Sequence, residues 1–483
     1  MDPTEQSIRA LQTAMGQGRT TARELVEAFL ARIDAYDQRG PALNSILLAT
    51  PDAHAQADAL DRERRQGWQR GPLHGIPVLV KDNQHVEGLP TRAGCRALAG
   101  LLAREDAFVV HRLREAGAVL LGKTNLHELS AGFTSVGSVH GRVRNPYDPT
   151  RTPGGSSGGT AAAVSASFAA AGTASDTCGS IRIPAAFTAT VGLRPTQGLT
   201  SRYGVVPLAL SQDVVGPIAR SVEDLALLLD VMVGTDPRDE QTAMIRGRSF
   251  AFAEALGKSS LRGRRIGRLA SRFDRQEEDE EVAHLVDAAS KHAEACGAAI
   301  VPIEIGEIAA LLDLNFISIL AEFQADLDGW LANEPSAPVR SVAEIAASGL
   351  VHPEVAPLVA GAVSAGAGLG EAYEKARRNR ARLRRLLDSL FDELELDAIA
   401  YPSMGRVAAR HGEVQRANNA HLAADSGFPA VSLPAGLTMA GMPVGIELLG
   451  RRFEDVALLG IAYELEQAVG ARRPPPSTPP LGA

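Results

Sequence analysis

The sequence predicts an α/β protein, in which helices cover the faces of a β-sheet. Short, continuous apolar runs at 76–80 and 118–122 are typical of strands that are buried on both faces. Helical patterns alternate with these runs, as at 105–116 and 160–169, and this alternation indicates strands joined by covering helices. With 483 residues, of which 45% are hydrophobic, the chain is long enough to bury a large core.

The N-terminal part, residues 1–70, is expected to be a helical segment packed on the core. Thr21 and Glu24 have the spacing of a helix capping box, and 52–66 is expected to form another helix. Residues 71–470 are expected to form a single domain, because no linker or repeat interrupts them. The Pro-rich end, 471–483, is expected to be a disordered tail.

Strands and helices continue to alternate after the first strands. A strand of small residues is expected at 170–175, followed by a short helix through Phe187, and Ser221 is expected to cap a helix. The region 305–370 is expected to be mostly helical and carries no motif. Further strands are expected at 264–270, 298–303, 397–402, 429–436 and 443–449, helices at 280–295 and 371–395, and turn-rich loops at 192–198 and 211–217.

Composition narrows the classes of function. A net charge of −8 gives no support to nucleic-acid binding, and the basic run 377–384 is expected to be a solvated helix face. The three cysteines, Cys95, Cys178 and Cys296, have neither metal-ligand spacing nor a disulfide pattern. The N-terminus does not resemble a signal peptide, and no run of about 18 apolar residues suggests a membrane span. A cytoplasmic protein without membrane contacts is therefore expected.

The expected chemistry lies around the double serine of Gly154-Gly-Ser-Ser-Gly-Gly159. Glycines allow the backbone to approach a ligand closely, and the helix expected from Thr160 would direct its first amides at the serines. Lys81 follows a buried strand, at the sheet edge where ligands bind in open α/β sheets. The simpler alternative is a lysine that caps the strand and reaches solvent. A lysine that stays buried can lose its proton and act as a base.

A second serine, Ser180, follows the tight turn 176–180, whose amides could bind an oxyanion. A serine needs a base to become a nucleophile. No Gly-x-Ser-x-Gly elbow surrounds Ser180, although with 11 histidines a Ser-His-Asp triad stays open. Together these features favour nucleophilic acyl transfer.

The motifs resemble those of the amidase signature family, most closely bacterial peptide amidases. The resemblance covers most of the chain and is strongest over 71–236, the expected signature core. The resemblance is specific, because five motifs occur in the same order as in the family. They are Pro72-Leu-His-Gly-Ile-Pro-Val-Leu-Val-Lys-Asp-Asn83, Gly122-Lys-Thr-Asn125, Gly154-Gly-Ser-Ser-Gly-Gly159, Asp176-Thr-Cys-Gly-Ser-Ile-Arg-Ile-Pro184 and Gly216-Pro-Ile-Ala-Arg220.

The resemblance implies the amidase signature fold: a large, mixed, mostly parallel twisted sheet with helices on both faces. It also implies a Ser–cis-Ser–Lys triad, in which Ser180 is the nucleophile, Ser156 the bridging serine and Lys81 the base. A cis peptide bond next to Ser156 is expected with it. The implied oxyanion hole consists of the backbone amides of Thr177, Cys178, Gly179 and Ser180, and the implied loop supports are Ser157, Asp176 and Arg182. No metal or other cofactor is implied.

Cys178 departs from the family, which commonly has glycine there. Its side chain could narrow the acyl pocket, or strain the turn if φ is positive. A nucleophilic role for Cys178 is disfavoured, because Ser180 keeps the motif position and buried thiols are usually inert.

The expected function is hydrolysis of a small-molecule or peptide amide. The alternatives are the amidase-type subunit of a tRNA-dependent amidotransferase complex and a non-catalytic relative. The variable region, about 305–425, is expected to set the substrate, and the sequence specifies neither the amide nor the assembly state, for which a homodimer is one option.

Overall fold

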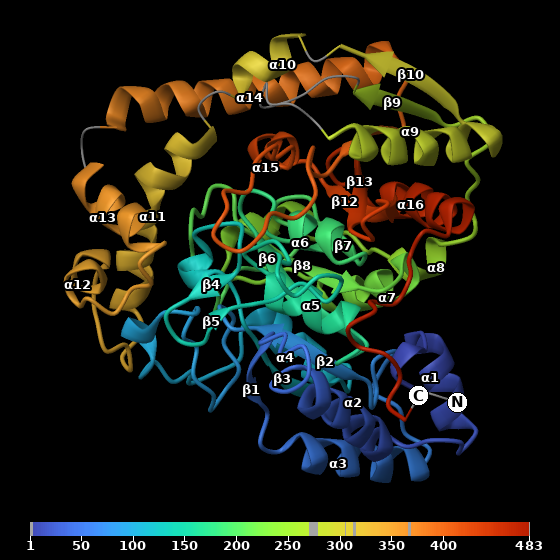
Figure 1. Cartoon of the computed structure of the whole chain (residues 1–483), viewed down its shortest axis with the longest axis vertical. Helices are drawn as coiled ribbons and strands as arrows, with labels where there is room; N and C mark the ends of the chain where they lie inside the picture. The colour runs from blue at the N-terminus through green and yellow to red at the C-terminus, as the bar shows by residue number, and fades with distance from the viewer. Residues whose placement is uncertain (1–2, 270–278, 305, 313–314, 366–368, 483) are drawn as a thin grey trace.

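A computed structural model describes residues 3–269, 279–304, 306–312, 315–365 and 369–482 (Figure 1). Its main feature is an 11-stranded sheet with the strand order β1-β3-β2-β6-β8-β7-β12-β13-β11-β9-β10. The strands of this sheet are β1 (Ile46–Ala49), β2 (Pro77–Lys81), β3 (Val119–Thr124), β6 (Ala171–Asp176), β7 (Val191–Arg194), β8 (Val214–Ala219), β9 (Arg265–Leu269), β10 (Ala299–Ile303), β11 (Ala398–Pro402), β12 (Ala430–Leu437) and β13 (Pro443–Leu449). A separate two-stranded ribbon consists of β4 (Val136–Gly137) and β5 (Gly141–Arg142).

The sheet is large and mixed, as expected. Parallel pairs occur in two blocks, β3-β2-β6 and β11-β9-β10, while the strands between these blocks pair antiparallel. Among the neighbouring pairs of the described sheet, four are parallel and six antiparallel, so parallel pairing is less frequent than expected. The first parallel block carries Lys81 at the end of β2.

Helices cover both faces of this sheet, which confirms the predicted α/β class. Side chains of β8 show the two faces: Val215 lies in the core cluster that includes α7, whereas Ile218 packs with Val164 of α5. The helices are α1 (Ile8–Gly16), α2 (Ala22–Tyr36), α3 (Ala53–Arg65), α4 (Phe108–Glu115), α5 (Gly158–Ser165), α6 (Arg182–Phe187), α7 (Val222–Met232), α8 (Phe252–Ala255), α9 (Glu280–Ala295), α10 (Gly306–Leu311), α11 (Asn315–Ala332), α12 (Val342–Ala347), α13 (Ala356–Ala365), α14 (Gly370–Glu393), α15 (His421–Ser426) and α16 (Asp455–Val469).

The N-terminal segment is helical in large part, and α2 begins at the predicted capping box. Thr21 accepts a hydrogen bond from the Glu24 amide, and the Glu24 carboxylate accepts one from the Thr21 amide. The segment is not entirely helical, however. Residues 46–49 form β1, which extends the sheet by pairing antiparallel with β3.

Two stretches that were expected to be loops, 192–198 and 211–217, supply most of the central strands β7 and β8. Their glycines and prolines resemble turn residues, but they serve close packing inside the sheet. A Cβ added to Gly216 would lie 2.2 Å from the Leu193 carbonyl oxygen, and one added to Gly192 would lie 2.8 Å from the Ala185 methyl group. Glycine is required there because neighbouring atoms, a backbone oxygen at Gly216 and a methyl group at Gly192, are too close for a side chain.

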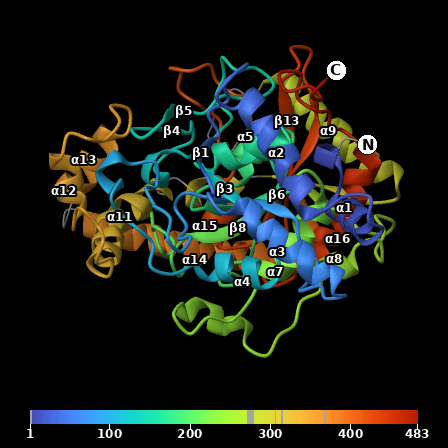
Figure 2. The same ribbon diagram turned by 90° about the horizontal axis from the view of Figure 1, so that it is seen from below.

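Helices α11, α12 and α13 lie together at one side of the molecule in both views (Figures 1 and 2). Phe323, Leu327 and Leu331 of α11 are buried in a cluster shared with α12 and α13. The stretch Gly306–Ala332 is long and apolar enough to cross a membrane by length and composition, which was not expected from the sequence. A core helix meets the same criteria, so this stretch is weak support for a membrane span.

The Pro-rich tail is ordered through residue 482, contrary to the prediction of disorder. It returns to the N-terminal helices, where the buried Arg32 of α2 donates hydrogen bonds to the carbonyl oxygens of Thr478 (2.8 Å) and Pro479 (3.0 Å). Tyr36 also donates to Pro479. Residues 478 and 479 of the tail consequently lie against α2. A proline-rich segment can be held by its carbonyl groups, because proline keeps that acceptor.

Substitution of Gly216 by alanine tests the tight contact between β7 and β8. The new Cβ would collide with a backbone oxygen, so we expect a loss of about 1–3 kcal/mol in the free energy of unfolding. Urea unfolding measures this loss. Gly361→Ala is the control, because that glycine lies in α13 with no atom within 4 Å of the added Cβ, and alanine there should stabilise by about 0.5–1 kcal/mol. Equal stability of Gly216→Ala and the wild type would contradict this packing.

Candidate active site

Lys81 ends β2 in the middle of the first parallel block, and its side chain is fully buried. Its Nζ atom lies 2.7 Å from Ser156 Oγ and 2.8 Å from Ser175 Oγ. Ser175 Oγ also accepts a hydrogen bond from Asn83 Nδ2 (2.9 Å). Burial lowers the pKa of Lys81 to about 7, against the opposing effect of the carboxylates of Asp176 and Asp213. The alternative of a solvent-exposed strand cap is therefore wrong.

A second buried lysine, Lys123, differs from Lys81 in its contacts. Lys123 on the neighbouring strand β3 lies 3.0 Å from the Asp82 carboxylate and also donates to the Pro90 carbonyl oxygen. It has the partner that a buried cation normally needs. The hydrogen-bond partners that the structure gives Lys81 Nζ are hydroxyl groups, which can also accept from, or donate to, a neutral amine.

The double-serine loop precedes α5, and the peptide bond between Gly155 and Ser156 is cis. Ser157 connects this loop with its surroundings: its amide donates to the Ser180 carbonyl oxygen (3.1 Å) and its hydroxyl to the Ser175 carbonyl oxygen (3.1 Å). The loop that carries Ser156 is therefore joined directly to the turn that carries Ser180. The first amide of α5, that of Gly158, does not reach the site, because it donates to Ser135 Oγ (3.0 Å).

The turn before Ser180 is organised by the buried carboxylate of Asp176. This carboxylate accepts from the amides of Gly179 (2.8 Å) and Ile181 (3.1 Å), and it forms ion pairs with Arg182 (3.1 Å) and Arg194 (3.0 Å). Burial raises the pKa of Asp176, but the two guanidinium groups outweigh it and hold the pKa below its usual value. A permanently charged Asp176 therefore fixes the turn.

The amide of Gly179 was expected to be an oxyanion donor, but the structure gives it another partner. That amide already donates to Asp176, so Thr177, Cys178 and Ser180 are the better candidates for oxyanion donors. Gly179 also has the positive φ of the turn, +113°, whereas Cys178 is not among the positive-φ residues of the described chain. The expected strain at Cys178 is therefore absent, because glycine occupies the position that requires a left-handed conformation.

Two contacts in the site have no counterpart in the sequence motifs. Cys178 Sγ lies 2.7 Å from Nδ1 of His421, the first residue of α15, and Asn418 Nδ2 lies 3.2 Å from Nε2 of the same ring. His421 and Asn418 come from the variable region.

Ser175 was also missed as a site residue by the sequence analysis. Alternation along β6 places it on the same side of the strand as Thr173, whose Oγ1 accepts a hydrogen bond from the Lys81 amide.

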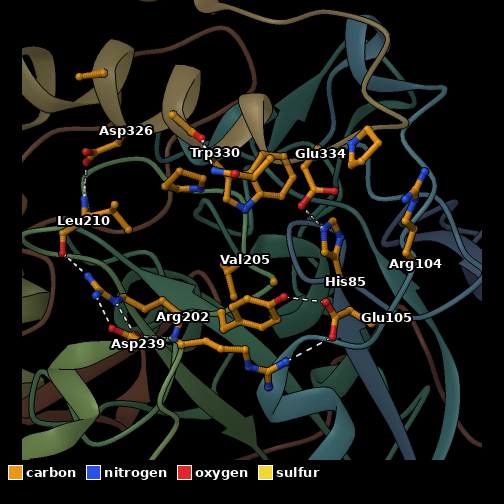
Figure 3. Close-up of a pocket in the computed structure, with 18 residues that line it drawn as sticks. His85, Arg104, Glu105, Arg202, Val205, Leu210, Asp239, Asp326, Trp330 and Glu334 are labelled. Carbon is orange, nitrogen blue, oxygen red and sulfur yellow. Dashed lines mark hydrogen bonds and ion pairs between the residues drawn. The ribbon is translucent and has the colours of Figure 1, made fainter.

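A cavity of about 610 Å³ lies beside this site, between α11 and the segment 202–210 (Figure 3). Several of its wall groups pair with each other: Arg202 with Asp239, Arg238 with Glu105, and His85 with Glu334 (3.1 Å). Asp326 instead accepts a hydrogen bond from the Leu210 amide (2.7 Å). Neither Lys81 nor Ser180 lines it. The pair of His85 and Glu334 joins the segment after α11 to the segment that follows β2.

Asp176→Asn tests the role of the charged carboxylate. The change leaves two buried guanidinium groups without their shared anion, so we expect a loss of about 3–5 kcal/mol in the free energy of unfolding. Chemical denaturation measures the loss. Asp34→Asn, which affects an exposed pair with Arg39, should change stability by less than about 1 kcal/mol. A similarly small effect at Asp176 would mean that the turn is held by other contacts.

Comparisons with known proteins agree with the geometry. The model of the Amidase family matches residues 24–459. The solved peptide amidase of Stenotrophomonas maltophilia is 37% identical, covers 98% of this chain and 99% of its own, and superposes with a TM-score of 0.91. A glutamyl-tRNA(Gln) amidotransferase subunit of Synechococcus sp. (strain CC9605) is 34% identical over 98% of this chain and 99% of its own length.

The corresponding amidotransferase subunit of Thermotoga maritima, in a solved structure, is 27% identical and covers 98% of both chains with a TM-score of 0.78. Two named activities thus occur among proteins similar to this one, and both act on amide C–N bonds. The family match spans most of the chain and includes the segments that carry Lys81, Ser156 and Ser180. The chain belongs to the amidase signature family and is an enzyme that acts on amide C–N bonds.

Proposed function

We propose that this enzyme hydrolyses a carboxylic amide to an acid and ammonia or an amine, through an acyl-enzyme on Ser180. The observation that carries the proposal is the 2.7 Å contact between the buried Nζ of Lys81 and Ser156 Oγ. With a pKa of about 7, Lys81 is neutral in a large fraction of molecules at neutral pH and can accept a proton. The transfer between Ser156 and Ser180 is the step that the proposal adds to the observed contacts.

In the first half of the reaction, Ser180 Oγ attacks the amide carbonyl carbon. Its proton passes to Ser156 Oγ, whose own proton passes to Lys81 Nζ, so that the lysine becomes an ammonium. The carbonyl oxygen gains the negative charge and is bound by the amides of Thr177, Cys178 and Ser180. When the C–N bond breaks, the proton returns from Lys81 through Ser156 to the leaving nitrogen, and an ester on Ser180 remains.

In the second half, water attacks the ester and its proton takes the same route to Lys81. The tetrahedral intermediate then collapses, the proton returns through Ser156 to Ser180 Oγ, and the acid leaves. Asp176 and Arg182 take no proton in this scheme. They hold the amides in place, and Ser157 keeps the two serine-bearing segments joined.

The relatives support two versions of this chemistry. The peptide amidase similarity favours a free-standing hydrolase whose substrate is a peptide amide or another small amide. The sequence similarity to the glutamyl-tRNA(Gln) amidotransferase subunit favours a second candidate, in which the chain works within an amidotransferase complex. We place the hydrolase first, because the peptide amidase has the higher TM-score of the two solved structures, 0.91 against 0.78. A homodimer and a cytoplasmic location are compatible with either version and remain predictions.

Ammonia release by the purified chain distinguishes the two candidates. The test panel contains a peptide with an amidated C-terminus, an aliphatic amide and an aryl amide. We expect release without any added subunit, and Ser180→Ala should lose at least about 10⁴-fold in kcat with its fold retained. Ser364→Ala, a change on α13, should retain full activity. Release only with added partner subunits and charged tRNA would instead support the amidotransferase role.

The pH dependence of kcat/KM tests the base. Lys81 accepts a proton only when neutral, so kcat/KM should rise about tenfold per pH unit below pH 7 and level off above it. Lys81→Ala should lose several powers of ten in rate, whereas Lys375→Ala, an exposed change on α14, should have no effect. A small effect of Lys81→Ala would point to a histidine base.

A further inference from the structure

The segment 417–421, which leads into α15, packs directly on the turn that carries the proposed oxyanion donors. A Cβ added to Gly179 would lie only 2.5 Å from the Ala420 methyl group. Beside this contact, Cys178 is approached by two side chains of the same segment. His421 Nδ1 lies 2.7 Å from its Sγ, and Asn418 Nδ2 lies 3.5 Å from its carbonyl oxygen. One short segment therefore contacts both the backbone and the side chain of Cys178.

The hydrogen bonds of Asn418 determine which way its amide faces. The Ala420 amide donates to Asn418 Oδ1 (2.9 Å), so this oxygen points toward the start of α15. The Nδ2 group then faces Nε2 of His421, at 3.2 Å, and can only donate to it. His421 Nε2 is consequently an acceptor, and a neutral imidazole that accepts at Nε2 carries its proton at Nδ1.

The protonated Nδ1 faces Cys178 Sγ, which is therefore the acceptor of this contact. Burial and the nearby Arg182 guanidinium lower the pKa of His421 to about 4, which keeps the ring neutral at neutral pH. Burial likewise raises the pKa of the Cys178 thiol well above its usual value. A neutral ring that already carries a proton at Nδ1 cannot remove one from the thiol. This pair is not a catalytic Cys-His dyad.

We propose that His421 and Asn418 are positioning residues, which fix the backbone amide of Cys178 toward the oxyanion through contacts with its sulfur and carbonyl oxygen. This inference rests on the proposed acyl-enzyme mechanism. The side chain of Cys178 would then serve as an attachment point. The glycine that the family commonly has at this position offers no side chain for such contacts. The consequence is kinetic, because a displacement of about 1 Å in a catalytic group can cost 10²-fold in rate.

Variants on both sides of the contact test this inference. His421→Gln retains a polar group near Nε2 but loses the donor to sulfur, whereas His421→Asn retains a donor near Nδ1. Cys178→Ala removes the acceptor and leaves the backbone intact. We expect His421→Gln and Cys178→Ala each to lower kcat by about 10- to 100-fold with KM within about twofold, because the amide acts on the transition state. His421→Asn should stay within about threefold of the wild type.

The double variant His421→Gln/Cys178→Ala should be no slower than the slower single variant, because both remove the same contact. His284→Gln, an exposed change on α9, is the control and should match the wild type. Thermal unfolding of each variant shows that the fold is retained. If His421→Gln does not fold, Cys178→Ala tests the contact alone.

Phosphonylation of Ser180 by a fluorophosphonate, located by peptide mass spectrometry, provides a second readout. Its rate should fall in parallel with kcat, since this reagent also develops negative charge on an oxygen beside the turn. Wild-type kinetics in His421→Gln, equal losses in His421→Asn and His421→Gln, or single losses that multiply in the double variant would each overturn the inference. A wild type that is not labelled at Ser180 would overturn the proposed function itself, and this inference with it.

Discussion

A buried lysine held by hydroxyl groups is the constraint on which the rest of the site depends. Lys81 ends a strand that lies between two others, and its side chain is fully buried. Its hydrogen-bond partners are Ser156 and Ser175, which can solvate an amine but do not compensate a full positive charge. Desolvation therefore lowers the pKa of Lys81 to about 7. The fold therefore keeps a neutral amine, which can accept a proton, at a pH at which lysine is normally protonated.

The carboxylate of Asp176 keeps its charge in the same site, whereas burial favours the neutral form of Lys81. Two guanidinium groups and two backbone amides surround it, and its charge is retained. Arg182 also pairs with Glu447 of β13, which binds the hydroxyl of Tyr401 on β11 (2.7 Å). The turn that presents Ser180 is thus anchored to strands from the C-terminal half of the chain. A fixed charge holds the geometry, while the neutral lysine can exchange protons.

Sequence patterns predicted the strands and helices whose own residues show a clear hydrophobic pattern. The strands β2, β3 and β6 were found because apolar or small-residue runs between helical patterns have few other solutions. The strands β7 and β8 were missed because Gly192, Gly216 and Pro217 resemble turn residues, and only the packed sheet shows why glycine is needed there. The tail was misjudged for a similar reason. Its proline content indicated disorder, whereas its carbonyl groups bind Arg32 from the other end of the chain.

The residues of the candidate site also fall into two groups: those that the sequence motifs identify and those that only the folded structure reveals. Lys81, Ser156 and Ser180 occur in motifs that the family resemblance identifies, and the structure brings Lys81 into contact with Ser156. His421 and Asn418 could not be found, because they lie more than 200 residues from Cys178 in a region without a motif. The commitment of the Gly179 amide to Asp176 was equally hidden, since a donor's partner depends on the folded turn. Long-range contacts of this kind are determined by tertiary packing.

The role of Lys81 as the base is tested most directly by its own titration, observed by NMR in protein with ¹³C-labelled lysine. The chain has five lysines, Lys81, Lys123, Lys258, Lys291 and Lys375, so the spectrum is simple, and Lys81→Gln assigns the relevant signal. We expect the ¹³Cε signal of Lys81 to titrate near pH 7. A midpoint near pH 10.4, the ordinary value for lysine, would show that the side chain remains an ammonium at neutral pH and would contradict its role as the base.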